Sequence, residues 1–126
     1  MADSPTFRFE KANDCLIVRA LTREILEKKA ATFQALAAAI KARSPKATLV
    51  DLRAVPGPVT FMDRYQVGEQ TGRFLSGLTV AALMREEQTD KERIGQKVAM
   101  NRGARVEVFT DPTAAEAWLK KYATPA

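Results

Sequence analysis

Apolar and polar residues alternate in short blocks along the chain, and the blocks predict strands and helices in turn. Residues 6–10 alternate phenylalanine with charged residues, the period of a half-buried strand, and 15–18 form a short apolar run. Residues 11–14 between them contain Asn and Asp, which tolerate left-handed backbone and bond their own chain. The chain is therefore expected to begin with a β-hairpin.

A long helix is expected from Thr22, as its N-cap, to about Arg43. Apolar residues recur at helical spacing over 21–40, and Glu24 suits the positive end of the helix. The Ser44-Pro45 pair then ends it, because the residue before a proline avoids helical backbone.

Three further segments predict strands. The runs 48–52 and 79–84 are nearly continuous apolar stretches, typical of strands covered on both faces in a parallel sheet. Residues 105–109 alternate apolar and charged side chains. The only carboxylate in the first of these runs is Asp51, and a buried carboxylate needs a partner.

Helices are predicted to follow these strands. Thr60 and Asp63 have the spacing of a capping box, and Thr89 with Glu92 has the same spacing for the next helix. On the first of these helices, the residues expected on the apolar face, with glycines approaching the sheet closely, are Phe61, Tyr65, Gly68 and Gly72. The large helical residues expected in the core are Phe33, Phe61, Met62, Tyr65 and Trp118.

The end of the chain carries its own start and stop signals. Gly103 stands where a C-cap glycine is expected, and Asp111 followed by Pro112 predicts the start of a terminal helix. Residues 115–119 supply the apolar stripe of this helix, and the tail 123–126 is expected to fray.

The element order is β-β-α-β-α-β-α-β-α, which predicts an α/β fold. Right-handed crossovers require a mostly parallel sheet of four to five strands flanked by helices, with the first strand antiparallel near an edge. The chain is expected to be one domain, 1–126, with an ordered core of about 6–122. Ligands of such sheets bind outside the carboxyl ends of the strands, which here are the loops 53–60 and 85–89.

Composition narrows the chemistry. The 126 residues include no histidine and one cysteine, which excludes Ser-His-Asp and Cys-His nucleophilic sites, His-ligated metals and intrachain disulfides. The net charge of +5 mildly favours an anionic partner, but no basic-aromatic interleaving indicates nucleic acid. No apolar stretch approaches the length of a membrane span, residues 1–5 lack a secretory signal pattern, and a cytoplasmic location is expected.

Several segments resemble the STAS superfamily of sulfate-transporter and anti-sigma-factor-antagonist domains. The first are 50–55 (Val-Asp-Leu-Arg-Ala-Val) and 61–63 (Phe-Met-Asp). The segments 101–103 (Asn-Arg-Gly), 106–111 (Val-Glu-Val-Phe-Thr-Asp) and 114–119 (Ala-Ala-Glu-Ala-Trp-Leu) are similar to small stand-alone SpoIIAA-like bacterial proteins.

The resemblance covers 7–121 and implies the fold more than the role. In regulatory members, an Asp at the start of the second helix precedes a serine that a partner kinase phosphorylates. Asp63 matches that Asp, but Arg64 and Tyr65 follow it, so the serine is absent and with it the charge switch. The fold is shared with CRAL-TRIO-type lipid-binding domains, which implies a lipid as an alternative ligand.

The candidate binding residues are Asp51, Arg53, Thr60, Asp63, Arg64, Tyr65 and Arg85. Asp51 either faces a partner or ligand, or bonds loop amides and an arginine structurally. Arg53, Arg64 and Arg85 either converge on an anion beside the Thr60 helix start or are solvated separately.

No metal or other cofactor is expected, because Glu86, Glu87 and Asp90 lack a ligand spacing and fit a polar loop. The sequence favours a non-enzymatic interaction or regulatory module that binds a protein partner or a second copy. The alternative is a binder of an anionic lipid or small metabolite at the strand ends. A carboxylate enzyme using Asp51 and Glu86 ranks last.

Overall fold

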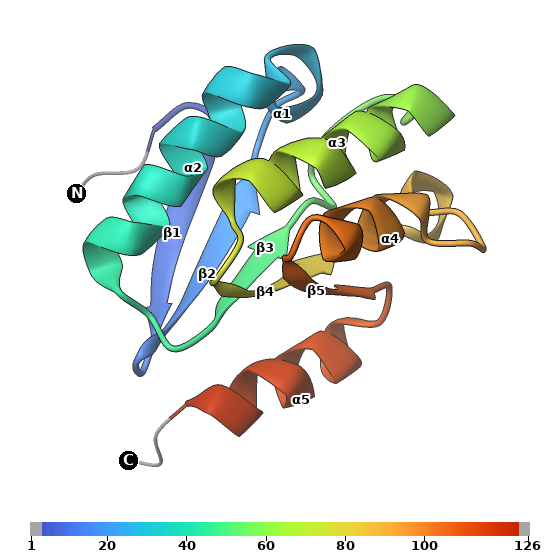
Figure 1. Cartoon of the computed structure of the whole chain (residues 1–126). Helices are drawn as coiled ribbons and strands as arrows, with labels where there is room; N and C mark the ends of the chain where they lie inside the picture. Colours follow the sequence, from blue (N-terminus) through green and yellow to red (C-terminus); the bar gives the residue numbers. More distant parts are fainter. Residues whose placement is uncertain (1–3, 124–126) are drawn as a thin grey trace.

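Five strands form one sheet in the order β1-β2-β3-β4-β5 in a computed structural model, which describes residues 4–123 (Figure 1). The strands are β1 (Phe7–Ala12), β2 (Cys15–Ala20), β3 (Thr48–Asp51), β4 (Thr79–Leu83) and β5 (Arg105–Phe109). β1 pairs antiparallel with β2, and every later pair is parallel. The mostly parallel sheet with an antiparallel first strand at its edge is therefore confirmed.

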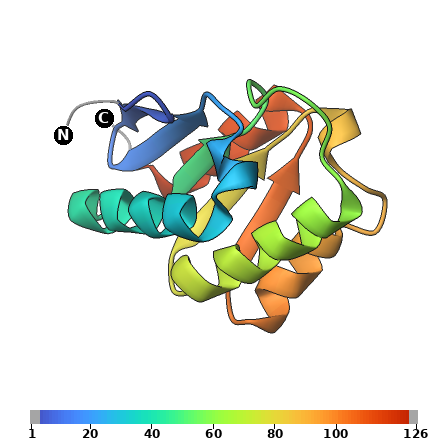
Figure 2. The ribbon, with the colours of Figure 1, turned by 90° about the horizontal axis from the view of Figure 1, so that it is seen from above.

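Helices cover both faces of this sheet unequally. They are α1 (Glu24–Glu27), α2 (Lys29–Arg43), α3 (Phe61–Phe74), α4 (Ile94–Asn101) and α5 (Pro112–Tyr122), with a 3-10 turn η1 (Glu86–Gln88). Helices α1 to α4 lie on one face and α5 lies alone on the other, with α3 between α2 and α4 (Figures 1 and 2).

Each face has its own core. The larger one joins β1, β2, β3 and β4 to α1 and α2 and includes Val18, Phe33, Leu36 and Val50. The smaller one joins α5 to the sheet through Leu49, Ala81 and Trp118. Phe33 and Trp118 are buried as predicted.

The first hairpin is tighter than the sequence suggested. β1 continues to Ala12, and the turn is the two residues Asn13 and Asp14, with Asn13 in left-handed backbone at φ 55°. Asn13 and Asp14 of the predicted turn 11–14 are confirmed, but Lys11 and Ala12 belong to β1. Both strands are longer than predicted because their ladder extends to the turn and to Ala20.

The long helix predicted from Thr22 is two helices. Lys28 leaves helical backbone at φ −129°, so α1 ends there and α2 begins at Lys29. Two side chains bond carbonyl groups of α1 at this break: Lys29 Nζ donates to Leu26 O at 2.6 Å, and Thr32 Oγ1 donates at 3.2 Å to Glu24 O, which also accepts the Lys28 amide. Thr22 is also not the N-cap, which is Arg23.

The capping box at the start of α3 is present. Thr60 N donates to Asp63 Oδ2 and Asp63 N donates to Thr60 Oγ1, both at 3.0 Å. The predicted box at Thr89 and Glu92 is wrong: α4 begins at Ile94, whose amide donates to Asp90 at 3.2 Å. Residues 91–93 lie in the turn before it, with Arg93 in left-handed backbone.

The apolar face predicted for α3 is partly wrong. Phe61 and Met62 are 59% and 55% exposed, so neither belongs to the core. Gly68 and Gly72 are buried, but they approach α4 and not the sheet: a Cβ at Gly68 would lie 2.5 Å from Gly95 O. The reason is that α3 packs between two neighbouring helices, so its small residues serve a helix contact.

The predictions for the two ends fare differently. Asp111 caps α5 through a bond from Thr113 N at 3.0 Å, Pro112 is the first helical residue, and Gly103 follows α4 at φ 90°. These three predictions are confirmed. Fraying was expected for 123–126, of which 124–126 lie outside the described residues, as do residues 1–3.

Candidate functional site

Two loops meet where the parallel strands end. The Arg85 guanidinium donates to Arg53 O and, at 3.2 Å, to Val55 O. Gln88 Nε2 donates to Leu52 O at 2.9 Å and to Val55 O at 3.4 Å. The loop after β3 and the loop after β4 therefore lie side by side at one rim of the sheet, as predicted.

Gln88 is the central residue of this junction, and the sequence did not single it out. Its side chain is 2% exposed, and its Oε1 also accepts the Arg85 amide at 2.7 Å. Gln88 stands in the polar segment 85–88, whose composition is typical of a surface loop, so no local pattern distinguishes it from the residues beside it. Only the position of the loop after β3 makes it a buried anchor.

The loop after β3 is also held from its other side. Arg23 Nη1 donates to Pro56 O at 2.7 Å and to Pro58 O at 2.9 Å. Gly57 between them has φ 83°, which favours glycine. The loop therefore has a defined shape, because the arginines just before α1 and η1 and the glutamine at the end of η1 bond its carbonyl groups.

Asp51 lies on the α5 face of the sheet among arginines. Its Oδ1 accepts the Arg53 amide and Nε, both at 3.0 Å, and its Oδ2 accepts Arg53 Nη2 at 2.9 Å and Arg19 Nη1 at 3.2 Å. Arg19 also donates to Glu10 at 2.9 Å. The buried carboxylate thus has the loop amide and arginine partners of the structural interpretation.

The arginine contacts outweigh the burial of Asp51. Burial raises the pKa of this carboxyl. The hydrogen bonds and charge of Arg53 and the charge of Arg19 together lower the pKa by more than burial raises it, so the net pKa lies below its ordinary value. The group stays ionised at neutral pH and acts as an acceptor. Charged Asp51 on β3 therefore joins β2, which carries Arg19, to the loop after β3, which contains Arg53 near the strand end.

The sequence left open whether Arg53, Arg64 and Arg85 converge on an anion or are solvated separately, and in the structure each has its own protein acceptors. The Arg53 guanidinium turns to Asp51, Arg64 Nε donates to Gln88 O at 3.2 Å, and Arg85 also pairs with Glu87 at 3.3 Å. Arg64 and Arg85 thus share the η1 segment, while the Arg53 side chain bonds on the α5 face. Binding of an anion by these groups stays a prediction.

Thr60, Asp63 and Tyr65 belong to the start of α3. Besides its capping bonds, Asp63 accepts Lys29 Nζ at 3.0 Å. Burial raises the pKa of Asp63, but the Thr60 and Lys29 bonds lower it more, so its net pKa is below ordinary. This carboxylate therefore joins α3 to α2, and Tyr65 lies half-buried one turn beyond Phe61.

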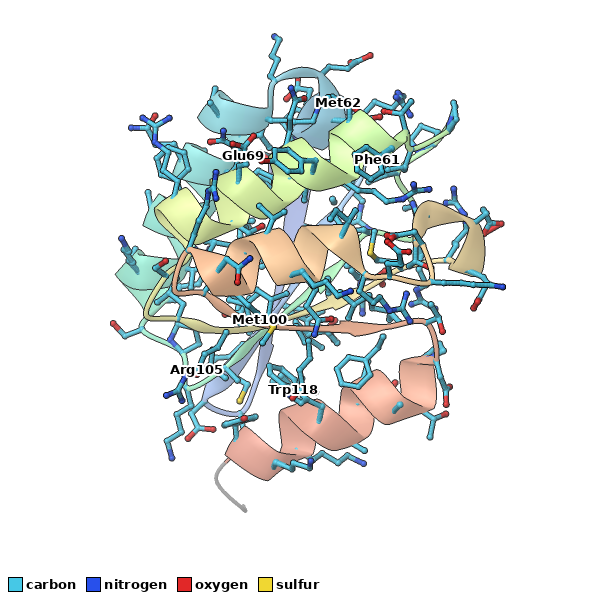
Figure 3. The ribbon with its side chains drawn as sticks, turned by 45° about the vertical axis from the view of Figure 1, so that its right-hand side comes forward. Phe61, Met62, Glu69, Met100, Arg105 and Trp118 are labelled. Atoms are coloured by element: carbon cyan, nitrogen blue, oxygen red, sulfur yellow. The ribbon has the colours of Figure 1, made fainter. Side chains whose placement is uncertain are left out.

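Two exposed apolar side chains adjoin the loop after β3. Phe61 and Met62 are the first two residues of α3, and both side chains lie on its outer side (Figure 3). We call the loop 52–59 together with these two residues the rim surface. It combines a loop held by side-chain hydrogen bonds with exposed apolar area, which is typical of a protein contact.

A separate apolar cavity of about 110 Å3 lies between the sheet and helices α3 and α4. Its lining includes Val67, Val80 and Val108, and its charged residues are Arg64, Asp90 and Arg93. A cavity of about 150 Å3 holds one benzene molecule. A lipid chain therefore does not fit unless the helices move.

Within residues 4–123, no three acidic or cysteine side chains gather as a metal site, so Glu86, Glu87 and Asp90 are not a ligand set. Among the same residues, no helix has the length and apolarity to cross a membrane. Cys15 lies in the smaller core, where burial raises the pKa of its thiol.

A five-stranded, mostly parallel sheet with four helices on one face and one on the other defines the class of α/β domain. The chain is similar to the crystal structure of an anti-sigma factor antagonist from Mycobacterium paratuberculosis, with 18% identity, a TM-score of 0.55, and coverage of 94% of this chain and 98% of that one. It is also similar to an uncharacterised protein with a SpoIIAA-like fold from Shewanella loihica PV-4, with 22% identity, a TM-score of 0.44, and coverage of 90% and 91%. No protein-family model and no curated protein matches the sequence.

The first of these comparisons shows a shared fold over nearly the whole of both chains. The fold that the STAS resemblance implied is therefore confirmed. At this identity the comparison shows the fold alone, and the partner and role are a separate question.

Proposed function

We propose that this protein is a non-enzymatic interaction module that binds a protein partner through the rim surface. The observation that carries the proposal is the exposure of Phe61 and Met62 at the start of α3, beside a loop held by Arg23, Arg85 and Gln88. Isolated exposed apolar side chains are common, but two adjacent ones on a fixed rim are typical of a contact. The similar fold of an anti-sigma factor antagonist, a protein that acts on another protein, supports this choice.

The serine that a partner kinase phosphorylates in regulatory STAS members has no counterpart after Asp63 in this sequence. Arg64 and Tyr65 follow Asp63, and Thr60 is used in the capping box. The proposed module therefore binds through shape and apolar area, and we expect its affinity to be set without a phosphate at the helix start.

The alternative, an anionic lipid or metabolite, is supported by the apolar cavity, whose charged lining residues are two arginines, Arg64 and Arg93, and one carboxylate, Asp90. Its volume of about 110 Å3 favours a ligand of only a few heavy atoms. Native mass spectrometry of protein purified from its own host separates the two ideas. A co-purifying small acid supports the alternative, and a bound protein supports the module.

The direct test is site-specific photocrosslinking in the host cell. A photoreactive phenylalanine analogue at position 61 is expected to give one protein adduct that mass spectrometry identifies. The same analogue at Lys41, which is exposed on α2, is the matched control and should give none. A heavier adduct made of two copies of this chain would identify a homodimer instead.

The contact is then checked by substitution. Met62→Ser removes exposed apolar area, and substitutions at such positions change stability by only about 0.5 kcal/mol. The adduct from position 61 should be lost while the melting temperature is kept. Equal labelling at positions 61 and 41, or an adduct unchanged by Met62→Ser, would refute the rim surface as the binding face.

A further inference from the structure

The last strand of the sheet leaves one edge without a neighbouring strand. β5 pairs with β4 alone, and it lies between α4 and α5 (Figure 3). Met84 N donates to Phe109 O at 2.9 Å, so the carbonyl of Phe109 points toward β4. Backbone groups alternate along a strand, so the amides and carbonyls of Val106 and Val108 point to the open edge. Within residues 4–123, no hydrogen bond joins these groups to another residue.

The open edge lies at the base of a groove of about 540 Å3. α4 supplies one wall with Met100, which is 53% exposed, and α5 supplies the other with Trp118 and the partly exposed Tyr122. An exposed strand edge is a template for another strand, and natural proteins normally cover or charge it. Here the strand edge is accompanied by apolar side chains on both sides.

We propose that a second copy of this chain pairs its β5 antiparallel with this β5, about a two-fold axis at Val106, and continues the sheet. Arg105 and Glu107 lie on the α5 face of the strand, are exposed, and have no ion pair with any other described residue. In this register each Arg105 lies directly opposite Glu107 of the second copy. The axis therefore creates two cross-strand ion pairs and leaves no charge facing its like.

The neighbouring registers do not offer this match. An axis at Glu107 places that carboxylate opposite its own copy, and an axis at Val108 places Glu107 opposite Phe109. A register that places odd-numbered residues of one β5 opposite even-numbered residues of the other would put the valines of one copy on the face that carries the charged residues of the other. Charge complementarity therefore selects both the occupant and the register.

The helices beside the edge fit the same arrangement. Continuing the sheet across the axis brings α4 toward α4 and α5 toward α5 of the second copy, because each flanks its own β5. Met100 and Tyr122 are then buried between the two copies. Burial of their apolar area stabilises the dimer in addition to the strand pairing and the ion pairs. This surface is at the opposite side of the sheet from β1 and does not include the rim surface.

The test is sedimentation velocity of the full chain at concentrations up to about 1 mM, a range that detects even weak association. We expect a reversible shift from 13.9 kDa to twice that mass. R105E and E107R each place like charges across the axis, and each should weaken the dimer by about tenfold. The double variant R105E/E107R restores opposite charges and should return the dissociation constant to within a few-fold of the original.

Two further variants separate pairing from folding. Val106→Pro removes the outward amide while the bonds to β4 use Arg105, Glu107 and Phe109, so it should give a folded monomer. Arg8→Glu makes the same charge change on β1 and should leave the dimer intact. Melting curves report the fold of each variant.

Four results would overturn the proposal. They are a monomer at every concentration, a double variant as weak as the single ones, a dimer that Val106→Pro leaves unchanged, and binding of a different protein at this edge with no self-association. Each of these results leaves the rim surface to its own crosslinking test.

Discussion

At the scale of single residues, Asp51 shows how a charge is tolerated in a buried strand. A lone carboxylate there would cost several kcal/mol. Four donor contacts from Arg53 and Arg19 replace the lost water, and both arginines keep part of their surface exposed. The residue is therefore a structural acceptor that ties the loop after β3 to the sheet.

The lowered pKa of Asp51 makes a prediction for stability against pH. A group with a lower pKa in the folded state stabilises fully above its unfolded pKa, about 3.9, and loses this effect as pH falls through the folded pKa. Asp51→Asn should lower the free energy of unfolding at neutral pH by about 1 to 2 kcal/mol, given the exposed arginines. Urea titrations between neutral and acid pH measure both effects.

The same titrations need a control on the same arginine network. Glu10 also pairs with Arg19, but its side chain is exposed. Glu10→Gln should change stability by less than about 0.5 kcal/mol and keep the steep acid limb. An Asp51→Asn protein with an unchanged acid limb would show that other groups control it.

At the scale of elements, the contact between α3 and α4 depends on missing side chains. Gly68 and Gly95 let the two helices approach: a Cβ at Gly68 would lie 2.5 Å from Gly95 O, and one at Gly95 would lie 2.9 Å from Arg64 O. Both obstacles are backbone atoms, which cannot rotate away. A side chain at either glycine would therefore force the two helices apart.

Gly68→Ala is therefore expected to reverse the usual order of helix propensity. In an exposed helix position the change stabilises by about 0.5 to 1 kcal/mol. Here the overpacking should dominate and destabilise by about 1 to 3 kcal/mol. Thermal unfolding measures the sign, and Arg73→Ala, at an exposed position of the same helix, serves as the control with little change. A stabilised Gly68→Ala protein would contradict this packing.

Helix starts were predictable where a side chain bonds a backbone amide two or three residues along the chain. Thr60 with Asp63 and Asp111 with Pro112 are confirmed, because the partners lie within three residues. The interruption at Lys28 and the late start of α4 were not predicted. The bonds near them join residues 8 and 36 positions apart, Thr32 to Glu24 and Gln88 to Leu52, which local spacing does not encode. Local signals fail where a tertiary contact takes over.

At the scale of the whole molecule, one buried side chain joins the two loops of the rim. Gln88 bonds two carbonyls of the loop after β3 and the amide of Arg85. Gln88→Ala would leave Leu52 O and Val55 O without this donor, in a position closed to water. The effect should therefore spread to the loop and not stay at the substituted residue.

We expect Gln88→Ala to lower the free energy of unfolding by about 1 to 3 kcal/mol. Hydrogen exchange of Val55, whose amide donates to Leu52 O at 3.1 Å, should become faster, because the loop loses its anchor. Glu87→Ala, at the exposed neighbouring position, is the matched control and should change neither quantity much. Unaltered exchange at Val55 in the Gln88→Ala protein would assign the loop shape to Arg23 and Arg85 alone.

The sequence by itself determined the order of strands and helices, the parallel sheet with its antiparallel first strand, and the rim where two loops meet. Hydrophobic period and local caps act within a few residues, and crossover handedness then fixes the topology. Only the tertiary structure decided that Phe61 and Met62 face solvent, that Gly68 meets α4, and that Gln88 is buried. Those outcomes depend on which neighbour each face receives, and no contact between distant segments is written in local spacing.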